Sequence, residues 1–325
     1  MAVQAREEQI RVHTERAAQR LSVAGQTLAL RQSATGPARG NVSPWPGCED
    51  LDFHGTLASI WIWQRAQDLA QNNVFVAHVA AGWRFVKALW PRFIPSALGG
   101  PASEEAAYDC AMVLRAAAVE RVGSGTPESR ELAGLASRLL AAHLGELEDF
   151  GGRAFRDPGF LAWSMADYAR AAGDRGLLAA ARGFVERAFG LKGIPQITAE
   201  PSAKDGLFDF SSTTATRLQA VLASEGSTPF TGAWLRERAA VAVPDGFTSR
   251  PRDENCWNAC VASALGRSFV VSTDVRFLRA HQAIMSRLDA RVGAMSGTVG
   301  RQPGFEDETL ATFYYSLALD SMVRG

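Results

Sequence analysis

Six clusters of acidic residues recur along the chain at nearly regular intervals, and each cluster opens an apolar stretch. With one acid taken from each cluster, the steps are 52, 53, 52, 45 and 53 residues. The apolar stretches place Ala and Leu at helical spacing, as in LASRLLAAHLGEL, and the main strand-like run is the short SFVVST. Such a repeat predicts an all-α chain whose units stack on one another. The acids used for the count are Asp52, Glu104, Asp157, Asp209, Glu254 and Asp307.

A second helix is predicted between successive clusters, as at 128–144, 174–190 and 273–289. Two of these helices start alike, because DRGLLAA and DVRFLRA lie 100 residues, or two repeats, apart. Six acid-led helices need six partners to close a double ring, and only five lie between the clusters. The sixth is an N-terminal helix over 5–31, which we expect to pack beside the last helix, 306–323. Closure would bury both open ends of the repeat array.

This pattern resembles the α/α-toroid superfamily, which includes terpenoid cyclases, protein prenyltransferase β-subunits and six-hairpin glycosidases and lyases. The resemblance covers nearly the whole chain and implies a single (α/α)6 toroid of six helical hairpins over residues 1–325. Residues 1–44 would form the outer N-terminal helix and its loop, and 45–325 would form the repeats. It also implies that the acid clusters share one rim of the barrel, where the active site of such folds lies.

The composition restricts the classes of partner that we expect for this chain. Acidic and basic side chains balance at 34 each, so no basic field favours nucleic acid. The N-terminus is charged throughout, and apolar runs such as FVAHVAAGWRFVKALW are broken by charge, so we expect neither a signal core nor a transmembrane segment. The four cysteines are scattered, unlike a disulfide framework. These features favour a cytoplasmic protein that acts on a small molecule, with its oligomeric state open.

The stretch Gly47–Trp63 contains the first candidate catalytic group. Acids in a first helical turn satisfy free N–H groups and oppose the helix dipole. One capping carboxylate is enough, however, and here several acids precede a histidine. If the helix begins near Asp50, the side chains of Asp50 and His54 share a face at i, i+4. A carboxylate in that position can orient or tune an imidazole for proton transfer.

The segment from Asp50 to Ala58, DLDFHGTLA, also resembles the Asp-x-Asp-Asp-Thr-Ala motif of class II terpenoid cyclases. The resemblance implies that Asp52 protonates an alkene or epoxide, with Asp50 as its neighbour. Phe53 stands where that family has its next aspartate, and the QW repeat of squalene-type cyclases is not evident. Carbocation chemistry needs an aromatic cavity. The candidates to line it are Trp61, Trp163, Trp257, Phe313 and Tyr314, which could equally fill the core of a toroid.

Carbohydrate chemistry is an alternative, because inverting glycosidases use two carboxylates about 6.5–9.5 Å apart. A rim that carries the acid clusters can present such a pair, and exposed Trp side chains would stack on sugar rings. Arginines beside the acids could bind a diphosphate or carboxylate, or pair with those acids. The candidate substrate-binding residues on this rim are Arg156, Asp157, Asp209 and Glu308.

The segment RDENCWNAC, residues 252–260, is the second segment that contains candidate catalytic or metal-binding residues. Asp253 and Glu254 are candidate catalytic acids. Cys256 and Cys260 lie one helical turn apart, which is too far for a disulfide. Protein prenyltransferases hold zinc with Asp, Cys and His, so Asp253, Cys256 and His54 form an alternative zinc site. The spacing here is Asp-x-x-Cys rather than the Asp-x-Cys of that family, and buried cysteines are ordinarily small hydrophobes. We therefore expect no cofactor, with zinc as the alternative.

These observations favour an enzyme with a site at the rim and in the cavity. The leading prediction is a terpenoid-cyclase-like lyase or isomerase, in which Asp52 protonates an isoprenoid or other apolar substrate. An inverting glycoside hydrolase or polysaccharide lyase is the second prediction. The third is a non-catalytic toroid that binds an apolar or peptide ligand, in which every acid serves as a helix cap.

Overall fold

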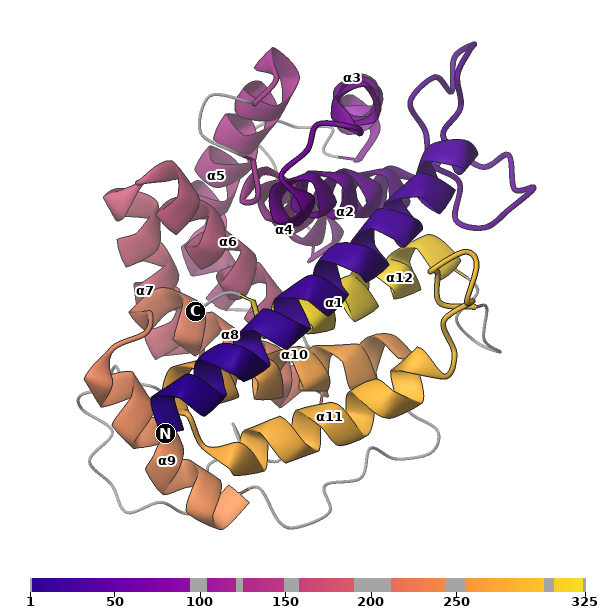
Figure 1. Cartoon of the computed structure of the whole chain (residues 1–325). Coiled ribbons are helices and arrows are strands. Elements are labelled where there is room, and N and C mark those ends of the chain that lie inside the picture. Colours follow the sequence, from indigo (N-terminus) through magenta and orange to yellow (C-terminus); the bar gives the residue numbers. More distant parts are fainter. Residues whose placement is uncertain are drawn as a thin grey trace.

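A computed structural model of the chain describes residues 2–93, 104–120, 125–148, 158–189, 212–242, 255–300 and 307–323. These residues form twelve α-helices and no β-strand (Figure 1), which confirms the all-α prediction. None of the helices within these ranges is long and apolar enough to cross a bilayer. The helices are α1 (Ala2–Arg31), α2 (Phe53–Ala70), α3 (Val76–Phe93), α4 (Glu104–Ala117), α5 (Pro127–Glu148), α6 (Pro158–Ala172), α7 (Arg175–Phe189), α8 (Ser212–Glu225), α9 (Pro229–Ala242), α10 (Asn255–Ser272), α11 (Val275–Asp289) and α12 (Glu308–Asp320).

Local sequence signals place the helix starts. Asp52 and Asp307 cap α2 and α12, each accepting a hydrogen bond at 2.8 Å from a backbone N–H three residues on. Asp174 and Asp274 begin the two similar segments DRGLLAA and DVRFLRA. They accept hydrogen bonds from first-turn N–H groups of α7 and α11 at 2.9 and 3.0 Å. A carboxylate cap satisfies a donor that the helix itself leaves unpaired. The strand-like run at 268–273 lies almost wholly within α10, because its packing partners override β-propensity.

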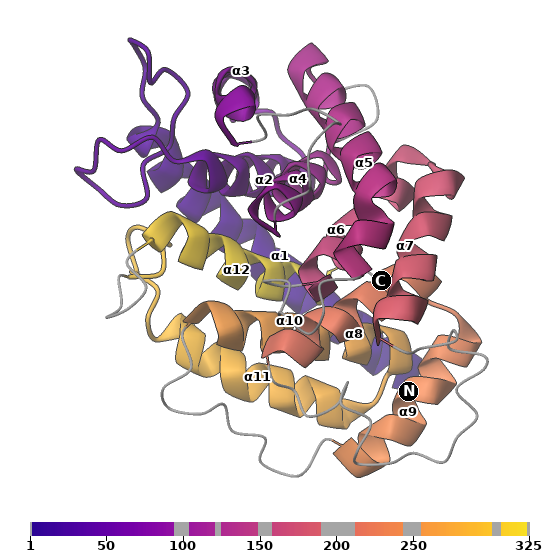
Figure 2. The same cartoon turned by 180° about the vertical axis from the view of Figure 1, so that it is seen from behind.

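The packing of the helices follows their order in the chain. The even-numbered helices pack in the sequence α2, α4, α6, α8, α10 and α12, and α12 packs against α2. The long helix α1 lies across the face of the molecule and packs against both α2 and α12 (Figures 1 and 2). The remaining odd-numbered helices each pack against an even-numbered neighbour.

Burial separates the two sets of helices. In α2 an almost unbroken run from Gly55 to Gln67 is buried, so this helix is enclosed on every side. In α11 the buried residues recur along one stripe that includes Phe277, His281, Ile284 and Leu288, while the other side faces solvent. Even-numbered helices such as α2 therefore form the interior, and odd-numbered helices such as α11 cover it.

The loops that precede α2 and α12 share one construction. Each contains an isolated antiparallel bridge, and in each a backbone N–H donates to a threonine hydroxyl of the following helix. The Val42 N–H bonds to Thr56 Oγ1 and the Val299 N–H bonds to Thr312 Oγ1, both at 3.0 Å. The bridges pair Gln32 with Val42 and Val292 with Val299.

Two glycines with positive φ let these loops lie against a neighbouring helix. A Cβ at Gly40 (φ +95°) would lie 2.2 Å from the Ala81 carbonyl oxygen in α3. A Cβ at Gly297 (φ +64°) would lie 2.9 Å from the Ala24 nitrogen in α1. The loop after α1 thus packs on α3, and the loop after α11 packs on α1 in the same way.

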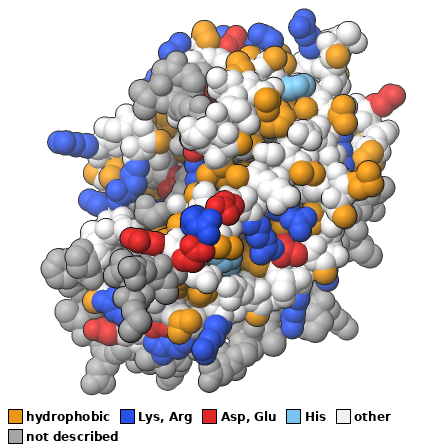
Figure 3. Space-filling view, in the orientation of Figure 1, with side chains coloured by type: hydrophobic (Ala, Val, Ile, Leu, Met, Phe, Trp, Pro, Cys, Tyr) orange, Lys and Arg blue, Asp and Glu red, His pale blue; other side chains and the backbone are white. Residues whose placement is uncertain are grey.

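The surface around α1 carries mixed charge. Where α1 crosses the face in Figure 3, acidic and basic side chains lie next to one another. Arg11 bonds to both Glu8 and Glu15 at this surface. The pattern agrees with the balance of 34 acidic and 34 basic residues in the sequence.

Candidate rim site

Asp52 lies at the start of α2 with its carboxylate folded onto the first turn. Asn41 fixes this segment, because its Oδ1 accepts the Asp52 N–H at 2.8 Å and its Nδ2 donates to the Asp50 carbonyl at 3.0 Å. Gly55 lets the carboxylate lie close to the helix, since a Cβ at that position would lie 2.1 Å from Asp52 Oδ2 and displace it. Oδ2 itself is buried and has no hydrogen-bond partner among the described residues. The capping bond therefore uses one oxygen and leaves the other for a proton or a ligand.

Asp307 caps α12, the helix that packs against α2. Burial raises the pKa of Asp307 to about 7, and the nearby charge of Asp52 adds to the rise. Burial likewise raises the pKa of Asp52, against the lowering effects of the Gly55 N–H and of His54. Two buried carboxyls that interact in this way do not both ionise readily, so the pair retains a proton near neutral pH.

His54, in the first turn of α2, pairs with a carboxylate from α4. Its Nε2 lies 2.5 Å from Asp109 Oδ1. Tyr108 packs edge-on against the imidazole, with ring centroids 5.1 Å apart, and its hydroxyl lies 3.0 Å from that of Tyr314 in α12. Side chains from the N-terminal halves of α2, α4 and α12 thus converge on one site, hereafter the rim site. It comprises Asp52, His54, Tyr108, Asp109, Asp307 and Tyr314.

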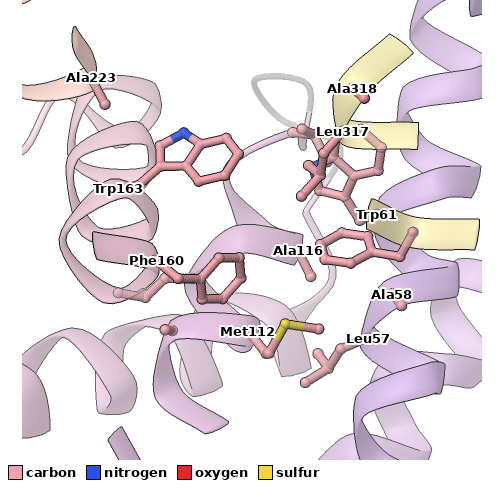
Figure 4. Close-up of a cluster of buried hydrophobic side chains, with 14 of the residues drawn as sticks. Leu57, Ala58, Trp61, Met112, Ala116, Phe160, Trp163, Ala223, Leu317 and Ala318 are labelled. Atoms are coloured by element: carbon pink, nitrogen blue, oxygen red, sulfur yellow. The ribbon is translucent and has the colours of Figure 1, made fainter. Parts of the chain in front are cut away.

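Aromatic contacts run from the rim site into the interior. Phe53 stacks on Phe93 at 4.5 Å beside the histidine, and Phe160 packs against both Tyr108 and Tyr314 at 5.6 and 6.3 Å. Farther in, Phe160 contacts Trp163 (Figure 4). Phe313 contacts Trp61. Four of the five aromatics proposed from sequence therefore lie in one continuous cluster: Trp61, Trp163, Phe313 and Tyr314.

Only a small cavity lies beside these rings in the described interior. The cavity lined by Trp61 and Trp163 has a volume of about 20 Å³. That is room for one or two water-sized particles. An isoprenoid does not fit there in this conformation, so the rim site is the better candidate for chemistry.

Asp50 does not take the position expected of it. The helix begins at Phe53 rather than near Asp50, so Asp50 lies ahead of α2 and shares no helical face with His54. Its exposed carboxylate accepts a hydrogen bond from Cys48 Sγ at 3.4 Å. Asp109, with 4% of its side chain exposed, is the carboxylate that orients the imidazole.

The other candidates divide between those that the structure places and those that it does not describe. Glu308 pairs with Arg31 at 2.7 Å, and both side chains are largely buried, so this acid helps to join α12 to α1. Within the described ranges no group of three or more His, Cys, Asp or Glu side chains is placed to hold a metal ion. Outside the described residues lie Arg156, Asp157, Asp209, Asp253 and Glu254, and the side chains of Cys256 and Trp257 in the first turns of α10.

Three members of the rim site were absent from the sequence-based candidates. Asp307 had a signal, because it belongs to the sixth acid cluster, although Glu308 beside it was chosen. Asp109 and Tyr108 lie inside α4, beyond its first turn, where no cap or motif marks them. Their role is revealed only by the packing of α4 against α2 and by the contact of Tyr108 with Tyr314 in α12.

No known protein family, no curated protein and no solved structure matches this chain. The assignment of a function therefore depends on the geometry of the site.

Proposed function

We propose that this protein is an enzyme whose rim site performs general acid catalysis, and that the twelve helices of the described ranges form an (α/α)6 toroid. The carboxyl pair Asp52–Asp307 is the single observation that carries the catalytic proposal. A helix cap needs only a hydrogen-bond acceptor, which a neutral Asn or Ser also supplies. Here burial raises the pKa of both capping carboxyls, toward protonation. Perturbed titrating groups grouped in this way are typical of acid–base sites.

The toroid is supported by the order of helix packing. Six even-numbered helices pack in chain order and the last packs on the first, which is the arrangement of an inner ring. The loop after α11 packs on α1 as the loop after α1 packs on α3. This cyclic relation supports a ring closed by the N-terminal helix.

The proposed chemistry is acid-initiated isomerisation or elimination on an unsaturated, largely apolar substrate. The protonated member of the pair donates to the substrate, and the His54–Asp109 pair is placed to accept a proton at the end of the reaction. Aromatic rings pack around His54 in the rim site, and aromatic faces stabilise positive charge that develops on carbon. This reaction belongs to the terpenoid-cyclase-like class, but we propose that it takes place at the rim site rather than in the interior cavity.

Glycoside hydrolysis is the second candidate. It is favoured by one observation, that two carboxyls with raised pKa values share the site with tyrosine hydroxyls. A glycosidase uses one carboxyl as acid and the other as base or nucleophile. The hydroxyls of Tyr108 and Tyr314 would then bind sugar hydroxyl groups.

The test is to assay two substrate panels with wild-type protein and Asp52→Asn. The first panel contains acyclic polyenes and their terminal epoxides, in D2O, and the second contains aryl glycosides. We expect products of the first panel to carry deuterium from the initiating proton, and Asp52→Asn to lower their formation by about 10²-fold or more. Asp274→Asn is the matched control, because Asp274 caps α11 and hydrogen bonding to Arg276 lowers its pKa.

Turnover of glycosides alone would replace the first reaction class by the second. Turnover that survives Asp52→Asn and Asp307→Asn unchanged would refute the carboxyl pair as the acid. Absence of turnover in both panels, together with ordinary carboxyl pKa values by NMR, would leave these acids as helix caps and refute the enzyme.

A further inference from the structure

A short buried segment, residues 41–44, joins the first turns of the two helices that carry the acid pair. It lies in the loop between α1 and α2, and each of its four residues is buried. Its first two residues bond to the start of α2, and its last two bond to the start of α12. The 41–44 segment thus connects helices that come from opposite ends of the chain.

At the α2 end, the bonds hold the backbone of Asp52 on both sides. Asn41 Oδ1 accepts the Asp52 N–H at 2.8 Å. The Val42 N–H donates to Thr56 Oγ1 at 3.0 Å, and the Thr56 hydroxyl donates in turn to the Asp52 carbonyl at 2.7 Å. The N–H and the carbonyl of this capping residue are therefore both tied to the 41–44 segment, directly or through one hydroxyl.

At the α12 end, Thr309 supplies both contacts. Its hydroxyl donates to the Ser43 carbonyl at 2.9 Å, and its backbone N–H donates to the Pro44 carbonyl at 3.1 Å. That N–H belongs to the first turn of α12, where a helix leaves its own donors unpaired. Asp307 accepts a second first-turn donor, the Leu310 N–H, at 2.8 Å. Because Thr309 is completely buried, water does not compete for these bonds.

The separation of the two carboxyls controls how they share a proton. The charge of Asp52 adds to the raised pKa of Asp307, and such an interaction weakens as the two groups move apart. Packing between α2 and α12 sets the distance between the helices, but packed helices can still slide a little against each other. Hydrogen bonds are directional, so the 41–44 segment restricts this sliding at the end where the carboxyls lie.

The other charged groups around the pair have partners of their own. His54 acts on both carboxyls, and Asp109 of α4 holds it through Nε2. Glu308, next to Asp307 in the chain, is paired with Arg31 of α1. With these charges held in place, the relative position of the two helix starts decides how strongly the carboxyls interact.

We propose that the 41–44 segment assembles the acid pair of the rim site by holding the starts of α2 and α12 at one fixed separation. Asn41, Thr56 and Thr309 are then positioning residues, because each acts on a carboxyl through the start of a helix. The inference rests on the acid pair of the proposed function and identifies the part of the chain that brings its two members together.

The experiment follows the Asp307 carboxyl by carbon-13 NMR during a pH titration of the full chain, with Asp307→Asn used to assign the signal. Thr309→Val and Thr56→Val each remove one hydroxyl of the connection and keep the size of the side chain. We expect the midpoint of Asp307 to fall from about 7 by about one pH unit or more in both variants, because the carboxyls separate and water reaches them. With any substrate that the two panels identify, the pH above which turnover falls should move down by the same amount.

Thr312→Val is the matched control. Thr312 is also completely buried in α12, and its hydroxyl accepts from the Val299 N–H at 3.0 Å and donates to the Glu308 carbonyl at 2.6 Å. This contact joins the same helix to a different loop, so the variant should keep the wild-type midpoint even if its Tm falls. Thr309→Ser retains the hydroxyl and should keep the wild-type midpoint as well.

Folded Thr309→Val and Thr56→Val proteins with the wild-type midpoint would overturn the inference and leave the acid pair standing. An equal shift in Thr312→Val would also overturn it, because the loss of any buried hydroxyl in this region would then suffice. A wild-type Asp307 that titrates as an ordinary carboxyl would instead refute the acid pair, and the inference with it. If one valine variant does not fold, the other decides the test, because each breaks the connection at a different helix.

Discussion

His54 and Asp109 are joined across α2 and α4, with Nε2 of the imidazole 2.5 Å from Oδ1 of the carboxylate. The carboxylate is 4% exposed and the imidazole is 31% exposed, so the pair has a buried side and a solvent side. The two residues are 55 positions apart, and the bond fixes how the first turn of α2 meets α4. A buried carboxylate that holds a half-exposed imidazole orients the ring for work at the surface.

Removing the carboxylate should destabilise the fold modestly. We expect Asp109→Ala to lower the free energy of unfolding by about 1–2 kcal/mol, because His54 loses its partner and part of the site is closed to water. Asp109→Asn keeps an oxygen acceptor and should cost less. Urea unfolding at pH 7 measures both values. An Asp109→Ala protein as stable as the wild type would show that the contact contributes nothing to stability.

Asp307 predicts a pH dependence of stability. Its folded-state pKa of about 7 lies above the ordinary value of 3.8, so the folded protein holds this proton more tightly than the unfolded chain does. Its contribution is therefore full below about pH 4 and is lost as the pH rises to about 7. The slope from this group is at most about 1.4 kcal/mol per pH unit. Asp307→Asn retains a capping side chain and should flatten the profile in this window.

Asp274 is a control for that measurement, because its contribution to stability changes with pH in the opposite direction. Hydrogen bonding to Arg276 lowers its pKa, so its contribution is present above the ordinary carboxyl pKa and is lost as the pH falls. Asp274→Asn should alter the acid limb of the profile and leave the slope between pH 5 and 7 unchanged. A slope in that window that is the same in Asp307→Asn as in the wild type would contradict the raised pKa of Asp307.

The Arg115–Asp167 pair should be among the costliest ion pairs to break. Its side chains are only 2% and 8% exposed, and Arg115 lies over the Trp163 ring at 4.0 Å. We expect Asp167→Ala to lower the free energy of unfolding by about 3–5 kcal/mol, because it leaves a buried guanidinium without its carboxylate.

The surface pair Lys87–Glu131 is the comparison for this prediction. Both of its side chains are about half exposed, so Glu131→Gln should change stability by less than about 1 kcal/mol. Chemical unfolding of the two variants under one set of conditions measures the difference. Equal losses would show that Arg115 gains compensating partners when Asp167 is removed.

Gly40 should tolerate no side chain. Gly40→Ala introduces a Cβ that would lie 2.2 Å from the Ala81 carbonyl oxygen, in addition to the strain of φ +95°. Gly36→Ala is the matched control, because Gly36 also has positive φ (+70°) and a Cβ there meets nothing within 4 Å. We expect the Gly36 variant to lose about 1–2 kcal/mol from backbone strain alone and the Gly40 variant to lose about 1–3 kcal/mol more. Similar Tm values for the two variants would contradict the close approach of the loop to α3.

Much of the helical framework could be predicted from sequence because its causes are local. Acid caps such as Asp52 and Asp174 act within three residues, and helical periodicity needs only the order of apolar residues. The helices predicted at 5–31, 128–144, 174–190 and 273–289 are present as α1, α5, α7 and α11, with ends that differ by several residues. The aromatic types that fill the interior could likewise be identified from composition.

The partners within the site required the tertiary structure. The capping role of Asp307 follows from its place at a helix start, but its pKa of about 7 depends on burial and on Asp52, which arrives from the other end of the chain. The bonds from His54 to Asp109 and from Arg115 to Asp167 join residues more than 50 positions apart. Local propensity contains no information about such pairs, because they exist only once separate helices pack. The sequence alone thus determined where helices begin and which faces are apolar, while packing decided which charges meet and how readily they hold a proton.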